Sequence, residues 1–385
     1  LRWPTLVDAF HLAHKPTSVD ETRIDSPSRK RIAFEELSMQ QAQIALSRWE
    51  LKHFGRNPDL QRKEAYSSWR DSPLVYAAVT SLPFSLTSQQ DICLEELWDD
   101  AVVGEDGRML RLLQGDVGSG KTVVAYLLGL GCIESGSGGR VVTIMCPTQL
   151  LASQHARTIS QYASRLQNQS DWRIHVELLN GNVIGKARDD LLLRLERSDD
   201  NHAVFLIGTH ALTTPDIIGR LEQIGISLAI IDEEQRFGVR QRQALTTAAA
   251  NSLFMSATPI PRSISQKRCG LVDFTHLQSE PRRVETSIVP SESLSKVLTV
   301  LTKKVEEGSK CFWVLPRIER EAGDTDEDST SDLNNVEDRY KMLVELFGEN
   351  RVCHVHGRMI DKDREAQIAR FADPSAQASI LVGTT

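Results

Sequence analysis

The sequence predicts an α/β fold in which a helical segment precedes two parallel sheets, each covered by helices on both faces. Two observations predict this fold class. Short apolar runs alternate with longer segments in which apolar residues recur at helical spacing, and the alternation restarts near residue 285. The chain has 385 residues, of which 40% are hydrophobic and 25% charged, so it can form two or three buried cores.

Residues 1–80 are predicted to be a helical connector. Apolar residues between Ile32 and Trp49 recur at helical spacing amid many charges. Polar stretches near residues 17–31 and 55–62 are typical of connections. No cluster of catalytic side chains occurs in this region, and we assign no chemistry to it.

Residues 81–280 are predicted to form the first α/β lobe. Its apolar runs read as buried strands and lie at 110–114, 141–146, 174–179, 203–207, 228–231 and 253–255. Helical patterns, for example 123–133 and 149–166, separate them. Buried strands that alternate with helices indicate one parallel sheet with both faces covered.

Residues 281–385 are predicted to form a second α/β lobe. Its strand-like runs are 286–289, 311–315, 352–355 and 380–382. The acidic, Ser/Thr-rich stretch 319–336 cannot support a packed core, so we expect a disordered surface loop there. Because the pattern stops inside a strand, we expect this lobe to be truncated at its C-terminal end.

A glycine-rich turn between the first strand of the first lobe and an apolar helix fits the pattern GxxxxGK[ST]. Its residues are Gly115, Asp116, Val117, Gly118, Ser119, Gly120, Lys121 and Thr122. Glycines let backbone N–H groups surround phosphate oxygens, and the helix N-terminus adds positive potential. We expect Lys121 to reach the β- and γ-phosphates of a nucleotide and the Thr122 hydroxyl to ligate Mg²⁺.

An acidic pair follows a later apolar strand and completes this predicted site. Asp232 is placed to hold Mg²⁺, and Glu233 to act as general base on the attacking water. An acidic pair at a strand end is commonly just solvated, but its position after a phosphate-binding turn favours function. The pattern Asp-Glu-x-x is typical of helicase-type motors rather than kinases or GTPases.

Several other strands end in turns that carry hydroxyl groups. Ser256 and Thr258 follow one strand and are candidates for coupling nucleotide hydrolysis to movement on DNA. Backbone N–H groups and hydroxyls at such turns also suit phosphate contacts that ignore base sequence. On this ground the candidate DNA contacts are Pro147, Thr148, Gln149, Thr209, His210, His356, Gly357, Arg358 and Thr384. Ordinary strand-end turns remain the alternative for each one alone.

The segment before the phosphate-binding turn suggests how the base is read. An amide presents both a donor and an acceptor, so Gln90 suits an adenine edge and favours ATP over GTP. Phe84 supplies a nearby apolar face. The alternative is that Thr87 caps a helix and that Gln90 is a surface residue of its first turn.

Several segments resemble the motor motifs of RecG-type DNA helicases of superfamily two. They read "LRLLQGDVGSGKT", "PTQLLASQH", "IIDEEQRFGVRQR", "SATPIPRSI", "FWVLPRIE" and "VHGRM". The resemblance covers nearly the whole chain and identifies both lobes as RecA-like. It implies ATP-driven remodelling of branched or forked DNA, in which stalled forks are regressed and Holliday junctions are moved. It also implies that residues 1–80 follow a DNA-wedge domain.

The chain departs from this family in two respects. The family commonly reads DEQH where this chain has Asp232-Glu233-Glu234-Gln235, a version similar to the transcription-repair coupling factor. A translocase that acts on stalled RNA polymerase is therefore the alternative function. The family's arginine finger would lie beyond residue 385, so we expect this chain to bind ATP but to turn it over poorly.

Composition excludes some classes and leaves others open. The net charge of −7 argues against a protein that coats nucleic acid by bulk charge. Six cysteines without a CxxC pair indicate buried, reduced thiols rather than zinc or disulfides. No run is long enough to span a membrane. We expect a monomer in bacterial cytoplasm, a plastid or a mitochondrion, with replication or repair proteins as possible partners. An ATP-binding scaffold without hydrolysis and an RNA helicase are weaker alternatives.

Overall fold

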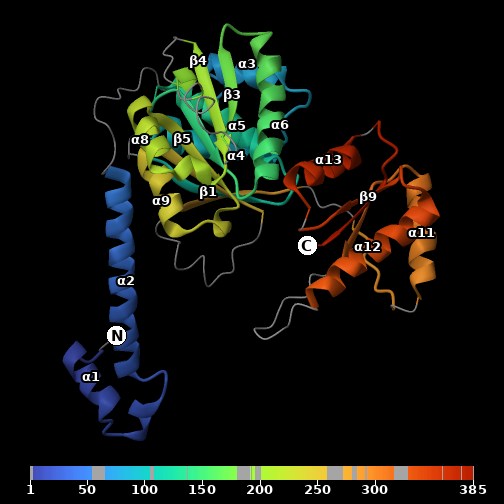
Figure 1. The fold of residues 1–385 in the computed structure, drawn as a ribbon. Helices are drawn as coiled ribbons and strands as arrows, with labels where there is room; N and C mark the ends of the chain where they lie inside the picture. Colours follow the sequence, from blue (N-terminus) through green and yellow to red (C-terminus); the bar gives the residue numbers. More distant parts are fainter. Residues whose placement is uncertain are drawn as a thin grey trace. The chain divides into compact units, whose positions relative to one another are not determined.

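The computed structural model forms two compact units, Leu1–Pro281 and Arg282–Thr385, which are described separately below (Figure 1). The described residues are 3–53, 66–104, 108–136, 138–179, 191, 193–195, 201–257, 272–279, 284–290, 293–315, 328–357, 359–373 and 375–384.

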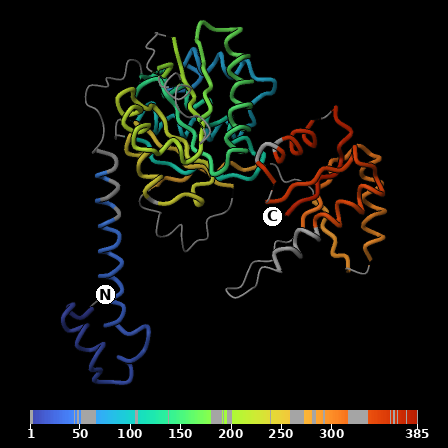
Figure 2. The backbone as a smooth tube through the Cα atoms, in the orientation of Figure 1, coloured from blue at the N-terminus to red at the C-terminus, as the bar shows by residue number. Residues whose placement is uncertain are grey.

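Residues 3–53 are mainly helical, as the apolar spacing between Ile32 and Trp49 predicted. The predicted connection 55–62 lies outside the described residues. Helix α1 (Leu6–His14) is capped by Thr5, whose hydroxyl accepts a hydrogen bond from the Asp8 N–H at 3.2 Å. A short 3₁₀ turn (Val19–Thr22) leads to the 27-residue helix α2 (Pro27–His53), drawn as the extended blue helix of Figure 2. Helices α1 and α2 contact each other, and the rings of Trp3 and Phe34 meet edge to face at 5.1 Å.

A seven-stranded parallel sheet forms the centre of the first unit, in the order β3-β4-β2-β5-β6-β1-β7. The strands are β1 (Leu110–Gly115), β2 (Val141–Met145), β3 (Arg173–Leu179), β4 (His202–Gly208), β5 (Ile226–Asp232), β6 (Ala249–Ser256) and β7 (Asp273–Leu277). Six of them match the predicted strands. The seventh, β7, was not predicted, because its sequence alternates polar with apolar residues at the edge of the sheet.

Two hydrophobic cores lie on opposite faces of this sheet. Alternate residues of one strand enter different cores: Phe205 and Ile207 join the first, whereas Val204 and Leu206 join the second. Helices α3 (Pro73–Ser81), α4 (Ser88–Trp98), α5 (Lys121–Glu134) and α6 (Gln149–Gln167) cover the first face. Helices α8 (Pro215–Ile224) and α9 (Val239–Ala248) cover the second (Figure 1). The continuous burial of β4 and β5 therefore follows from helices on both sides.

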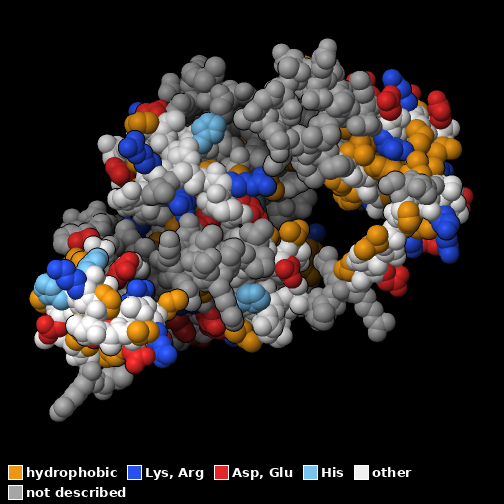
Figure 3. All heavy atoms as spheres, turned by 90° about the horizontal axis from the view of Figure 1, so that it is seen from below, with side chains coloured by type: hydrophobic (Ala, Val, Ile, Leu, Met, Phe, Trp, Pro, Cys, Tyr) orange, Lys and Arg blue, Asp and Glu red, His pale blue; other side chains and the backbone are white. Residues whose placement is uncertain are grey.

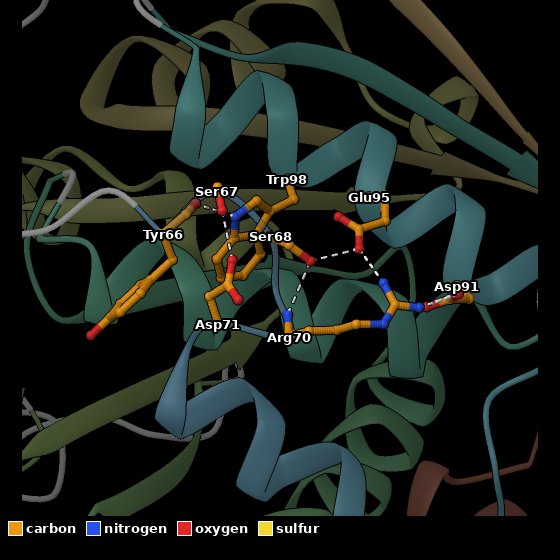
Figure 4. A network of polar contacts seen from close by, with 8 residues as sticks. All are labelled: Tyr66, Ser67, Ser68, Arg70, Asp71, Asp91, Glu95 and Trp98. Carbon is orange, nitrogen blue, oxygen red and sulfur yellow. Dashed lines mark hydrogen bonds and ion pairs between the residues drawn. The ribbon is translucent and has the colours of Figure 1, made fainter.

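The segment that precedes α3 is attached to helix α4 by polar contacts (Figure 4). The guanidinium of Arg70 bridges the carboxylates of Asp91 and Glu95, and the Ser68 hydroxyl donates to Glu95 at 2.7 Å. The indole N–H of Trp98 donates to the Tyr66 carbonyl at 2.9 Å. These contacts hold helix α4, whose first turn reaches the phosphate-binding turn described below.

The second unit contains a three-stranded parallel sheet in the order β8-β10-β9. Its elements are α11 (Leu294–Glu306), β8 (Cys311–Leu315), α12 (Asp328–Phe347), β9 (Val352–Val355), α13 (Asp361–Ala372) and β10 (Ile380–Thr384). Three of the four predicted strands are present. Phe312 and Val314 of β8 are exposed. Figure 3 shows hydrophobic side chains on part of the surface of this unit.

Two predictions for the second unit need correction. Residues 286–289 form no strand in the structure: they are largely exposed and make no ladder, because an apolar pair alone does not select a strand. The acidic stretch 319–336 was predicted to be a disordered loop, but helix α12 begins at Asp328 and continues to Phe347. Residues 319–327 of this stretch lie outside the described residues. The apolar residues of its later turns, Val336 and Leu343, are buried and stabilise the helix.

The five cysteines that the structure describes form no disulfide, and four of them are buried. Cys269 lies outside the described residues. Burial raises the pKa of the Cys93 thiol to about 11, assisted by the negative charge of Glu96. Burial likewise raises the pKa of Cys146. Within the described residues, no helix combines the length and apolar character that crossing a membrane requires.

These raised pKa values predict unreactive thiols in the folded chain. A rise of the Cys93 pKa from 9.0 to about 11 lowers the thiolate fraction at pH 8 by roughly a hundredfold. We expect iodoacetamide to modify Cys93 and Cys146 far more slowly in buffer than in urea, as measured by mass spectrometry of peptides. Equal rates in the two solvents would contradict the burial described here.

Candidate nucleotide-binding site

Parallel pairing brings the predicted site residues to one edge of the sheet. Strand β6 lies between β5 and β1, and its register pairs Met255 with Asp232 and Ser256 with Gln114. The carboxyl ends of these three strands therefore lie side by side. Open α/β sheets bind ligands at this edge.

The glycine-rich turn adopts a backbone that side chains would obstruct. Gly118 and Gly120 have φ angles of 81° and 96°, in the left-handed region. A Cβ atom at Gly120 would lie 2.2 Å from the Nε2 atom of Gln90, and one at Gly115 would lie 2.7 Å from the Leu277 carbonyl. The turn is thus packed closely from both sides, and its last two residues, Lys121 and Thr122, are also the first two of helix α5.

Lys121 lies within this turn. Its ammonium donates to the carbonyls of Gly115 at 2.6 Å and Asp116 at 3.0 Å. Burial lowers the pKa of Lys121, and the carboxylates of Asp232, Glu233 and Asp116 act in the opposite direction. The ammonium and both acidic strand-end side chains therefore belong to one electrostatic environment. The Asp116 carboxylate of the turn accepts a hydrogen bond from the Ser279 hydroxyl at 2.8 Å.

Asp232 is buried and both of its carboxylate oxygens are engaged. Oδ1 accepts the Glu233 backbone N–H at 3.0 Å, and Oδ2 lies 2.8 Å from the Nε2 atom of His155. The other ring nitrogen of His155, Nδ1, lies 3.5 Å from the Thr122 hydroxyl. One imidazole thus connects the two residues predicted to hold Mg²⁺. Sequence reasoning missed His155 as a site residue, although it ends the quoted segment "PTQLLASQH".

Glu233 has the only left-handed backbone among the described non-glycine residues, with φ 51°. Such a conformation costs about 1–3 kcal/mol and persists only where its surroundings impose it. The amide of Gln235 donates to the Glu233 carboxylate, and its oxygen lies 3.5 Å from the Ser256 hydroxyl. Glu234 is buried and pairs with Arg242 of α9 at 3.0 Å. Glu234 and Gln235 therefore stabilise the turn that contains Glu233.

The oxygen donors at this edge suit Mg²⁺. Magnesium is held in nucleotide sites by one or two protein oxygens together with phosphates and water, which matches a hydroxyl at Thr122 and a carboxylate at Asp232. The described residues contain no cluster of three or more His, Cys, Asp or Glu side chains that would form a metal site by itself. The Ser119 hydroxyl in the turn is buried and has no hydrogen-bond partner within the described structure. It remains available to a phosphate oxygen.

The two residues predicted to contact adenine differ in their exposure to solvent. Phe84 is 43% exposed and its ring meets Tyr162 edge to face at 6.2 Å. Gln90 is buried: its Oε1 accepts the Thr87 N–H at 3.0 Å, and its Nε2 donates to the Ser119 carbonyl at 2.9 Å. Of the alternative, the Thr87 cap is present, but Gln90 is not a surface residue: it completes a capping box and braces the phosphate-binding turn. Adenine contact by Gln90 stays a prediction.

The predicted DNA contacts divide into accessible and inaccessible residues. Thr148 is exposed and caps helix α6, accepting the Leu151 N–H at 3.3 Å, whereas Pro147 and Gln149 are half-buried beside it. His210 is exposed and Thr209 is buried, and DNA contact by either residue stays a prediction. In the second unit Gly357 is exposed, and His356 and Thr384 are half-buried. Thr258 and Arg358 lie outside the described residues.

Comparisons with known proteins agree with this geometry. A family model described as DEAD/DEAH box helicase matches residues 87–266. The ATP-dependent DNA helicase RecG of Staphylococcus epidermidis is 34% identical over 387 residues, which cover 99% of this chain and 51% of that protein. RecG of Bacillus subtilis is 31% identical over 388 residues, with coverages of 99% and 51%. The chain thus spans about half the length of the curated relatives it matches.

Solved structures give the same result. A structure of RecG bound to a three-way DNA junction matches with a TM-score of 0.62 at 27% sequence identity, covering 98% of this chain and 45% of that chain. The DEAD-box helicase Mss116 bound to ssRNA and UDP-BeF matches with a TM-score of 0.55 at 15% identity, covering 84% and 67%. The second likeness shows the fold alone.

The close packing of the phosphate-binding turn makes Gly120 sensitive to substitution. In Gly120→Ala the new Cβ would meet the Gln90 amide, and φ 96° would strain an L-residue. We expect the affinity for a fluorescent ATP analogue to fall by at least roughly tenfold, equivalent to about 1.4 kcal/mol. Gly219→Ala on helix α8, where a Cβ meets nothing within 4 Å, is the matched control and should leave affinity unchanged. Retained affinity in Gly120→Ala would show that the turn does not hold the nucleotide.

Proposed function

We propose that the chain is the ATP-driven motor of a DNA helicase or translocase, on the premise of its similarity to RecG-type ATP-dependent DNA helicases over about half of their length. One observation carries the proposal: the phosphate-binding turn of β1 and the acidic end of β5 lie at the same sheet edge, where Lys121 shares its electrostatic surroundings with Asp232 and Glu233. This arrangement suits a nucleotide triphosphate with its metal ion.

We propose distinct roles for the side chains at this edge. The backbone N–H groups of the glycine-rich turn and the Lys121 ammonium hold the phosphates, aided by the positive end of helix α5. Thr122 and Asp232 hold Mg²⁺, which when bound neutralises charge on the phosphate oxygens. Glu233 accepts the proton of the attacking water. Gln235, which contacts Glu233 and lies near Ser256, links this base to the end of β6.

Branched DNA is the proposed substrate. Support comes from the RecG structure bound to a three-way junction, which matches 98% of this chain. The exposed strand-end turns at Thr148 and His210 supply candidate phosphate contacts that do not depend on base sequence. The relatives described above carry the RecG name, which favours this substrate over the stalled RNA polymerase of a transcription-repair coupling factor. The RNA-bound helicase Mss116 is only 15% identical in sequence, so its likeness supports the fold only.

Substitution of the proposed base tests the motor function. In the longest form of the protein that its gene encodes, Glu233→Gln should lower DNA-stimulated ATP turnover by roughly 10²–10⁴-fold while ATP affinity is retained. Lys121→Ala should instead weaken ATP binding itself. Glu222→Gln, at an exposed position of helix α8, is the matched control. Unchanged turnover in Glu233→Gln would overturn the proposal.

The same assay separates the substrates. We expect a three-way DNA junction to stimulate ATP turnover more than a linear duplex of equal length and composition. Stimulation by single-stranded RNA that equals or exceeds that by the junction would instead favour an RNA helicase.

A further inference from the structure

His155 occupies a position that the proposed ATP site does not yet explain. It lies on helix α6, is 9% exposed, and was not among the predicted site residues. Its imidazole lies between the two side chains proposed to hold the metal: Nε2 is 2.8 Å from Asp232, and Nδ1 is 3.5 Å from the Thr122 hydroxyl. These side chains come from β5 and from the first turn of α5, so His155 joins three separate elements.

The contacts determine which ring nitrogen carries hydrogen. An ionised carboxylate only accepts hydrogen bonds, so the Nε2 atom that faces Asp232 must donate. In a neutral imidazole the other nitrogen is then an acceptor, and Nδ1 can receive the hydroxyl hydrogen of Thr122. In the tautomer with hydrogen on Nε2 alone, donation runs in one direction, from Thr122 through His155 to Asp232.

This direction suits a hydroxyl that binds a metal ion. A hydroxyl that gives a lone pair to a cation can still donate its hydrogen, and Nδ1 of His155 is placed to accept it. Asp232 is held on one oxygen by His155 and on the other by the Glu233 N–H at 3.0 Å, so its orientation is set from two sides. Hydrogen bonds to metal-ligating groups orient them and tune metal affinity.

We propose that His155 is a positioning residue for magnesium–nucleotide, holding Thr122 and Asp232 in the arrangement that binds the ion. The inference rests on the proposed ATP function of this edge and adds a residue to it. His155 touches neither the phosphates nor the attacking water in this assignment. It acts through the orientation of its two neighbours, with hydrogen on Nε2.

A purely structural histidine is the competing explanation, since buried polar side chains are commonly bonded for stability alone. The two explanations differ in what they predict for magnesium. A structural residue would change folding stability or nucleotide affinity equally with and without the ion. A positioning residue changes the enhancement of nucleotide affinity that Mg²⁺ produces.

The test measures that enhancement with a fluorescent N-methylanthraniloyl-ATP. Its dissociation constant is determined for the 385-residue chain in excess Mg²⁺ and again in EDTA, and the ratio of the two values is the magnesium enhancement. In His155→Phe, which keeps a ring but no hydrogen bond, we expect this ratio to fall by roughly 10–100-fold. The dissociation constant of His155→Phe in EDTA should stay within about twofold of that of the original chain.

Two further variants separate the contacts and control for histidine loss. His155→Gln can still present an N–H toward Asp232 but lacks the ring nitrogen that faces Thr122, so we expect an intermediate ratio. His175→Phe, at an exposed position on β3 at the edge of the sheet, should leave the ratio unchanged. Circular dichroism and urea unfolding establish that each variant is folded.

The tautomer provides a test that needs no variant to fold stably. In ¹⁵N-histidine-labelled chain, the His155 ring should show hydrogen on Nε2 and an unprotonated Nδ1, with its signals assigned by their loss in His155→Gln or, if that variant is unfolded, by through-bond correlation from the backbone. Hydrogen on Nδ1 alone would overturn the proposal. So would a magnesium enhancement in folded His155→Phe equal to that of the original chain. Failure of the original chain to bind ATP would instead refute the proposed function.

Discussion

Parallel pairing of β5, β6 and β1 is the constraint on which the site depends. Each strand ends at the same edge. A turn near residue 118 and a carboxylate at residue 232 therefore become neighbours, although they lie far apart in the sequence. Helices on both faces bury these strands. The edge therefore rests directly on a buried core, which suits a site whose proposed ligands must keep a constant geometry.

The polar residues of this edge form connected sets rather than isolated contacts. Gln90 braces the phosphate-binding turn from helix α4, which Arg70 in turn attaches to the preceding segment. Gln235 connects Glu233 with the end of β6, and Arg242 holds the neighbouring Glu234 from α9. The left-handed backbone of Glu233 is thus imposed from several sides. A strained residue at the position of the proposed base agrees with the tendency of strain to collect at functional sites.

Predictions from pattern succeeded where local signals were strong and failed where tertiary contacts decided. The six apolar strands predicted in the first lobe and the helices α5 and α6 are confirmed, because continuous burial leaves a clear periodic signal. The RecG resemblance, stated from motif wording, is also confirmed by the relatives. Strand β7 was missed because an edge strand mixes polar and apolar residues. The start of α12 at Asp328 was missed because the acidic composition of its first turns predicted a loop, whereas its later turns are buried and stabilise a helix.

The sequence by itself determined the α/β class, the order of the strands along the chain and the chemical types at each strand end. Those features follow from periodicity and from motifs a few residues long, which a single sequence records directly. Only the tertiary structure decided that Gln90 is buried against the phosphate-binding turn and that His155 lies between Thr122 and Asp232. The His155–Asp232 contact spans 77 positions, and its partners are selected by the packing of α6 on the sheet, for which no local pattern exists.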